Sequence, residues 1–140
     1  MNREKSVTIY LVSSCLVGLC TRYDGQIKES SECLDQLQDA LWIPICPEQL
    51  GGLPTPREAA DIVDGDGRDV LAGKARVVTK TGKNVTSAFI KGARQVLLIA
   101  QSQSIQGVLL KARSPSCAVH GTIGVTAALL QDHGFELTEL

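Results

Sequence analysis

Short runs of residues without charge alternate along this chain with longer segments of helical period. The runs are apolar and rich in β-branched or aromatic residues, which is typical of strands buried in a parallel sheet. Three predicted strands follow, at 6–13, 41–46 and 107–110. Apolar residues recurring every three or four positions predict three helices, at 30–40, 84–103 and 123–130. This order predicts an α/β fold, a single-domain, open, mostly parallel sheet flanked by helices in a Rossmann-like arrangement.

Other segments carry weaker signals. Pro44 places the second strand where a sheet tolerates proline. The stretch Thr55-Pro56-Arg57-Glu58 resembles a helix start, with a threonine cap, proline at the first helical position and a glutamate that closes a capping box. A short helix to Val63 is therefore expected. Residues 64–67 are expected to form a solvated acidic turn, and 135–137 an edge strand.

Length and composition favour one soluble domain. The chain has 140 residues, 44% hydrophobic and 21% charged, with a formal net charge of −1. We therefore expect a single domain over 1–140. The apolar stretch at 7–12 is too short for a signal peptide, and no run approaches the length that spans a bilayer. A cytoplasmic protein without membrane attachment is expected.

Five cysteines, an odd number, disfavour a disulfide framework and favour metal or catalytic use. Cys15 follows the first predicted strand, Cys46 ends the second, and Cys117 lies a few residues past the third. Parallel strands end at one edge of the sheet, where open α/β proteins bind ligands, so we expect these thiols to meet in one crevice. They suit a soft metal or an iron–sulfur cluster lacking its fourth cysteine. Cys20 and Cys33 are interpreted as structural.

Three motifs, in order along the chain, resemble those of one known family. They are Cys15-Leu16-Val17-Gly18 running to Arg22-Tyr23-Asp24-Gly25, then residues 46–57, then Lys111-Ala112-Arg113-Ser114-Pro115-Ser116-Cys117. Over nearly the whole chain, the sequence resembles the thiouracil desulfurase family. This resemblance implies a [4Fe-4S] cluster held by Cys15, Cys46 and Cys117. It also implies that the open iron accepts sulfur from a thiolated uracil in a non-redox desulfuration.

The same resemblance implies catalytic roles for Glu48 and Ser114. In apolar surroundings Glu48 could activate water as a general base, while a capping or solvated glutamate is an equal alternative by position alone. Ser114 could donate to the substrate, orient water or only form a serine turn. Ala118 follows Cys117 where the family pattern has glycine, and only 118–124 lead to the last helix.

Charged residues suggest how a substrate is recognised. Arg22 and Asp24 form a charged turn suited to reading the polar edge of a pyrimidine or to pairing with each other. Residues 70–131 hold eight basic residues and no acidic ones, whereas 26–69 is heavily acidic. This asymmetry favours a nucleotide or RNA partner beside a small thiolated pyrimidine, or mutual neutralisation of neighbouring elements.

Two other functions fit the same cysteines. A cluster-bearing sensor or scaffold would contain iron and sulfide but turn over no thiolated base. An enzyme using Cys15 or Cys117 as a nucleophile would contain no metal. Metal content separates the nucleophile from the desulfurase, and turnover separates the sensor from it.

Overall fold

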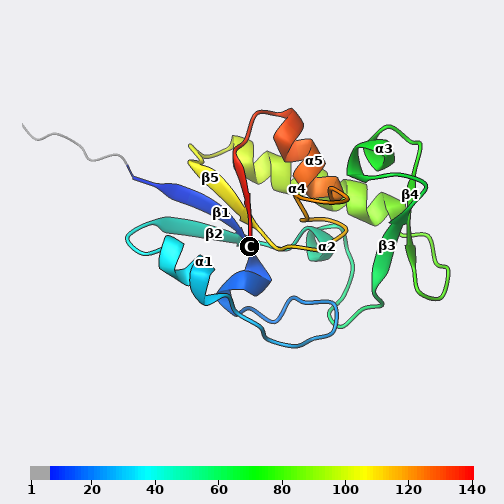
Figure 1. Cartoon of the computed structure of the whole chain (residues 1–140), viewed down its shortest axis with the longest axis horizontal. Coiled ribbons are helices and arrows are strands. Elements are labelled where there is room, and N and C mark those ends of the chain that lie inside the picture. Colours follow the sequence, from blue (N-terminus) through cyan, green and yellow to red (C-terminus); the bar gives the residue numbers. More distant parts are fainter. Residues whose placement is uncertain (1–6) are drawn as a thin grey trace, which may run out of the picture.

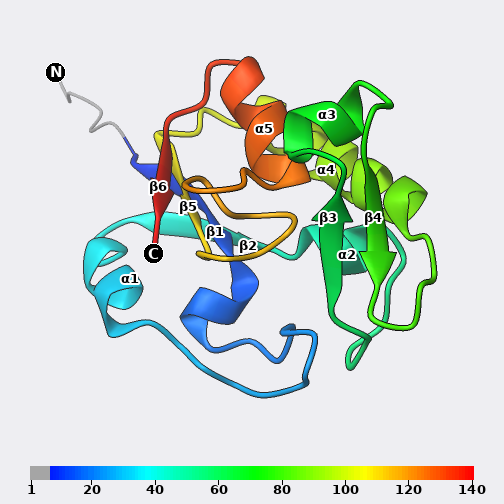
Figure 2. The same ribbon diagram turned by 45° about the vertical axis from the view of Figure 1, so that its right-hand side comes forward.

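The main sheet has four parallel strands. A computed structural model describes residues 7–140, so the predicted start of the first strand at Ser6 lies outside the described residues. The strand order is β2-β1-β5-β6 (Figure 1; Figure 2). The strands are β1 (Ile9–Ser13), β2 (Leu41–Ile45), β5 (Gly107–Leu110) and β6 (Leu137–Glu139). The predicted open parallel sheet is confirmed, and Pro44 lies in an edge strand as expected.

Helices cover both faces of this sheet. They are α1 (Ser31–Gln36) on one face and α4 (Thr86–Gln101) and α5 (Val125–Asp132) on the other. Successive residues of β1 serve the two faces: Leu11 packs in the core with α4 and α5, and Val12 packs with Leu16 and with Cys33 of α1. No helix within residues 7–140 is long and apolar enough to cross a membrane.

The chain leaves β1 and β5 in opposite directions. From β1 it passes through α1 to β2 on one side, and from β5 through α5 to β6 on the other. The two strands are neighbours, so their connections part at the carboxyl edge of the sheet. Such a switch point leaves an open crevice, the usual ligand site of open parallel sheets.

The helix predicted to run to Val63 is wrong. Residues Ala60–Val63 instead form β3, which pairs antiparallel with β4 (Arg76–Thr79) in a separate two-stranded sheet. The helix-start signals serve other contacts: the Thr55 hydroxyl accepts a hydrogen bond from Gln49 Nε2, and the Glu58 carboxylate accepts one from Thr81. Pairing with β4 therefore overrides the local capping pattern. The sequence prediction missed this pairing because β4 lies too far along the chain for a local pattern to reveal it.

The remaining elements differ from expectation at their ends or were not predicted. The first helix ends at Gln36, short of the expected 40. The expected solvated acidic turn forms at 64–65, and at its end Asp66 caps α3 (Gly67–Leu71) in a reciprocal capping box with Asp69. A short helix, α2 (Pro47–Leu50), follows β2 directly.

Two glycines bring α2 against α4. A Cβ at Gly92 would collide with the carbonyl of Pro47, and one at Gly51 with the carbonyl of Ala88. The two backbones therefore touch at a distance that only glycine allows. This contact fixes where α2, and with it Glu48, stands beside the sheet.

The short segment 118–124 is held by the end of β6. The Glu139 carboxylate accepts hydrogen bonds from the backbone N–H groups of Val119 and His120 at 2.8 and 3.0 Å. At the far end of the segment, Gly124 lies so close to the backbone of Ser116 that a Cβ would collide with it. The segment is thus tied down over its short length.

We predict that Gly92→Ala destabilises the protein. Alanine in a helix normally gains roughly 0.5–1 kcal/mol over glycine. Here the added methyl group must push α2 away from α4, which costs about 1–3 kcal/mol. Urea unfolding measures the change, with exposed Gln95→Ala on the same helix as the control. A Gly92→Ala protein as stable as wild type would contradict the close contact.

Candidate functional site

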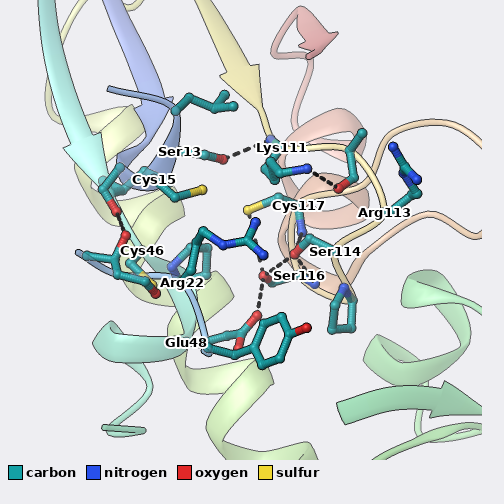
Figure 3. Close-up of a pocket in the computed structure, with 18 of the residues that line it drawn as sticks. Ser13, Cys15, Arg22, Cys46, Glu48, Lys111, Arg113, Ser114, Ser116 and Cys117 are labelled. Carbon is teal, nitrogen blue, oxygen red and sulfur yellow. Dashed lines mark hydrogen bonds between the residues drawn. The ribbon is translucent and has the colours of Figure 1, made fainter. Parts of the chain in front are cut away.

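The switch point opens into a cavity of about 710 Å³, a size typical of small-molecule sites. Cys15, Cys46 and Cys117 all line it, and all are free thiols. Figure 3 shows the sulfur atoms of Cys15 and Cys117 facing one another across the cavity. Cys20 is exposed, and Cys33 is buried on the core-facing side of α1. Neither lines this cavity. The structure therefore brings together the three predicted cysteines and leaves out the other two.

Cys15 and Cys46 sit on turns directly beyond a strand, and Cys117 follows β5 after a short loop. Cys15 lies in a single 3-10 turn, Ser14–Val17, which Gly18 ends with a φ of 92°. Cys46 caps the first turn of α2, where Pro47 fits because the first helical N–H needs no partner. Beyond β5, the carbonyls of Pro115 and Ser116 accept hydrogen bonds from the first N–H groups of α5. The turn before Cys117 is thereby anchored to that helix.

Burial is the largest influence on the pKa of two of the thiols, Cys117 and Cys15. It raises the pKa of Cys117 to about 12, although hydrogen bonds with Ser13 and Ser116 act in the opposite direction. Burial also raises the pKa of Cys15, opposed by the positive charges of Lys111 and Arg22. A metal that binds these sulfurs must therefore release their protons.

Glu48 faces the cavity from the first turn of α2. One carboxylate oxygen forms an ion pair with Arg57 Nε at 2.7 Å, and the other accepts a hydrogen bond from the Ser116 hydroxyl at 3.0 Å. Glu48 therefore stands among charged and polar groups, and the apolar surroundings considered for a general-base role are not present. Arg57 and Ser116 thereby hold both carboxylate oxygens in place at the cavity wall.

Arg57 joins the loops around the cavity. Its guanidinium donates hydrogen bonds to Glu48, to the carbonyls of Thr21 and Pro54, and to the Thr55 hydroxyl. Its Nη2 also lies 3.8 Å from the sulfur of Cys46. The side chain is 8% exposed, so this charge is compensated almost entirely by the protein.

Two serine hydroxyls connect Glu48 to the turn before Cys117 (Figure 3). Ser114 Oγ lies 2.9 Å from Ser116 Oγ, and Ser114 also accepts from the backbone N–H groups of residues 116 and 117. The serine-turn interpretation of Ser114 is therefore correct as far as the backbone goes. Ser114 also lies in the cavity wall, as a catalytic role would require.

Arg22 and Asp24 pair with each other. Two hydrogen bonds, of 3.1 and 3.0 Å, join Arg22 Nε and Nη2 to the Asp24 carboxylate. This contact lowers the pKa of Asp24 to about 2. Arg22 lines the cavity, whereas Asp24 does not and acts there only through the arginine it orients.

Several residues that line the cavity were given no role from the sequence. Ser13 accepts a hydrogen bond from the Lys111 backbone N–H at 3.0 Å, which ties the ends of β1 and β5 together. Arg113 adopts a positive φ of 60°, a strained backbone often found at functional sites. With the Arg57–Glu48 and Arg22–Asp24 pairs set aside, basic side chains still predominate in the lining: Lys28, Lys111 and Arg113 against Asp61. The cavity thus favours a negatively charged occupant.

A family model described as 2-thiouracil desulfurase matches residues 10–139. The chain belongs to this family. The expectation of an enzyme of this type, drawn from the three motifs, is thereby confirmed.

Two relatives of this desulfurase match nearly the whole chain. The uncharacterized protein YbbK of Bacillus subtilis (strain 168) is 40% identical over 139 aligned residues, which cover 91% of this chain and 92% of the relative. The solved structure of TudS, a [4Fe-4S]-dependent thiouracil desulfidase, matches with a TM-score of 0.79 and 37% identity. That alignment covers 96% of this chain and 91% of TudS.

The donor set of this desulfurase fits a cluster better than a single ion. Within residues 7–140, no three His, Cys, Asp or Glu side chains converge closely enough to bind one metal ion. An iron–sulfur cluster presents a separate iron to each thiolate, so its ligands stand around a cavity rather than at one point. Three free cysteines in a basic cavity match that arrangement.

We predict that Arg57→Ala lowers the free energy of unfolding by about 3–5 kcal/mol, because it leaves the Glu48 carboxylate buried without its partner. Denaturant unfolding tests this. The double variant Arg57→Ala with Glu48→Gln should recover part of the loss, since it removes the unpaired charge. If the losses in unfolding free energy of the two single variants simply add in the double variant, the ion pair contributes no coupling energy, which would contradict a stabilising Arg57–Glu48 pair.

Proposed function

We propose that this protein removes sulfur from a thiolated uracil, without net redox change, at a [4Fe-4S] cluster bound by Cys15, Cys46 and Cys117. Membership of the desulfurase family and the likeness to [4Fe-4S]-dependent TudS support the reaction and the cofactor. The observation that carries the ligand assignment is the convergence of three free thiols from β1, β2 and β5 on one cavity.

A cluster held by three cysteines would supply an open iron as a Lewis acid for the thiocarbonyl sulfur. The protein must then deliver water to the adjacent carbon. Glu48 is the base in this proposal, since Arg57 at 2.7 Å and Ser116 at 3.0 Å hold its carboxylate at the cavity wall. Ser114 completes the water-binding wall opposite α2.

Arg22 orients the substrate in this proposal. Asp24 holds its guanidinium through Nε and Nη2, and Nη1 has no hydrogen-bond partner within residues 7–140. That group can donate to a carbonyl oxygen, which uracil presents on its ring edge. The substrate is a free base, a nucleoside or a unit of RNA. Arg113 and Lys28 in the cavity lining support a substrate that carries phosphate.

Iron content tests the ligand assignment. After anaerobic reconstitution, single alanine replacements of the three cavity cysteines should each lose most of the bound iron. Cys20→Ser and Cys33→Ser should keep it, because neither thiol reaches the cavity. Loss of iron in Cys20→Ser would show a site closed by four cysteines and defeat the proposed open iron.

Turnover tests the base. Glu48→Gln keeps the side-chain shape but cannot take a proton, so uracil release from 2- and 4-thiouracil should fall about 10²- to 10⁴-fold while iron content stays at the wild-type level. Exposed Gln95→Ala is the control for handling and reconstitution. Equal turnover in Glu48→Gln would refute the assigned role. A fully loaded wild type without turnover would place the protein with sensors or scaffolds.

A further inference from the structure

Ser116 stands between the two residues to which the proposed function gives catalytic roles. It is 1% exposed, and its hydroxyl lies 3.0 Å from Glu48 Oε2 and 2.9 Å from Ser114 Oγ (Figure 3). No direct hydrogen bond joins Ser114 to Glu48 among residues 7–140. Any proton that passes between them within the protein therefore crosses Ser116.

The direction of the hydrogen bonds from Ser114 through Ser116 to Glu48 follows from how many hydrogen bonds each hydroxyl can accept and donate. A serine hydroxyl has two lone pairs and one proton. Ser114 Oγ already accepts from the backbone N–H groups of Ser116 at 3.2 Å and Cys117 at 3.0 Å. Its bond to Ser116 Oγ must therefore use its own proton. Ser116 accepts that proton and donates its own to Glu48, so both hydrogen bonds are directed from Ser114 in the cavity wall towards the carboxylate.

The competing contact of Ser116 is weaker. Its hydroxyl is also 3.6 Å from the sulfur of Cys117, but sulfur is a poor acceptor compared with a carboxylate oxygen at 3.0 Å. Arg57 occupies the other oxygen of Glu48 at 2.7 Å. The oxygen that Ser116 contacts is therefore the one left to receive a proton.

We infer that Ser116 relays a proton from Ser114 to Glu48 during the reaction, an inference that rests on the proposed function. The attacking water gives a proton to Ser114 Oγ as its longer backbone hydrogen bond opens. Ser114 passes its own proton to Ser116, and Ser116 passes its own to Glu48. Both serines keep one proton, hydroxide reaches the thiolated carbon, and Glu48 becomes a carboxylic acid. As the carbon–sulfur bond breaks, the added hydroxyl gives its remaining proton to the sulfur and Glu48 gives the second, so thiouracil and water yield uracil and hydrogen sulfide.

The relay predicts how the rate responds to deuterium. The single-turnover rate of uracil formation from 4-thiouracil by the loaded wild type, measured in mixtures of H₂O and D₂O, should curve below a straight line because several protons move together. Ser116→Ala should lower kcat about 10²-fold with KM unchanged and make the dependence linear. Iron per chain should match wild type, because the cluster ligands are untouched, and thermal unfolding should show the variant folded at the assay temperature.

Ser102→Ala is the matched control, since within residues 7–140 that exposed hydroxyl bonds only to the carbonyl of Ile99 at the end of α4. A linear dependence in the wild type would overturn the relay whether or not Ser116→Ala folds. So would wild-type kcat in Ser116→Ala, or a lowered kcat with the curvature kept, which would mark a purely structural hydroxyl. A loaded wild type without turnover would instead overturn the proposed function itself.

Discussion

The buried guanidinium of Arg57 is the contact on which the cavity depends. The walls around it are mostly turns, which have no ladder of backbone hydrogen bonds to fix them. Arg57 supplies that fixity by binding the carbonyl of Thr21, the loop at Pro54 and the carboxylate of Glu48 at once. Because a buried charge without partners is costly, these loops are held at the geometry that satisfies it. The position of Glu48 is thus a consequence of charge compensation, reinforced by the glycine contact between α2 and α4.

The sheet explains why the chemistry gathers at this point. Cys15 and Cys117 follow β1 and β5, which are neighbours whose connections part, and Cys46 follows β2 on the far side of β1. Turns at such an edge can place side chains around a ligand, while β1 and β5 behind them are largely buried. The predominance of basic residues in the lining would offset the negative charge of the thiolates in the proposed cluster.

The sequence predicted the main sheet and the meeting of the three cysteines because both follow from local patterns and one rule of topology. Buried strands have few charges, and parallel strands end together. The antiparallel pairing of β3 with β4 was missed because Thr55 and Glu58 carry helix-start signals, whereas in the fold these residues contact Gln49 and Thr81. The partners of Glu48 could not be predicted either: Arg57 is nine residues away and Ser116 sixty-eight, and only the folded chain brings them together.

The central claim is that three cysteines hold one cluster with an iron open towards Glu48 and Ser114. A crystal structure of anaerobically reconstituted protein, with anomalous differences measured at the iron edge, tests it most directly. The account predicts one four-iron centre in the cavity, bound by the sulfur atoms of Cys15, Cys46 and Cys117, with the fourth iron free of protein ligands and facing Glu48. Iron bound by Cys20 as a fourth ligand, or placed outside this cavity, would contradict it.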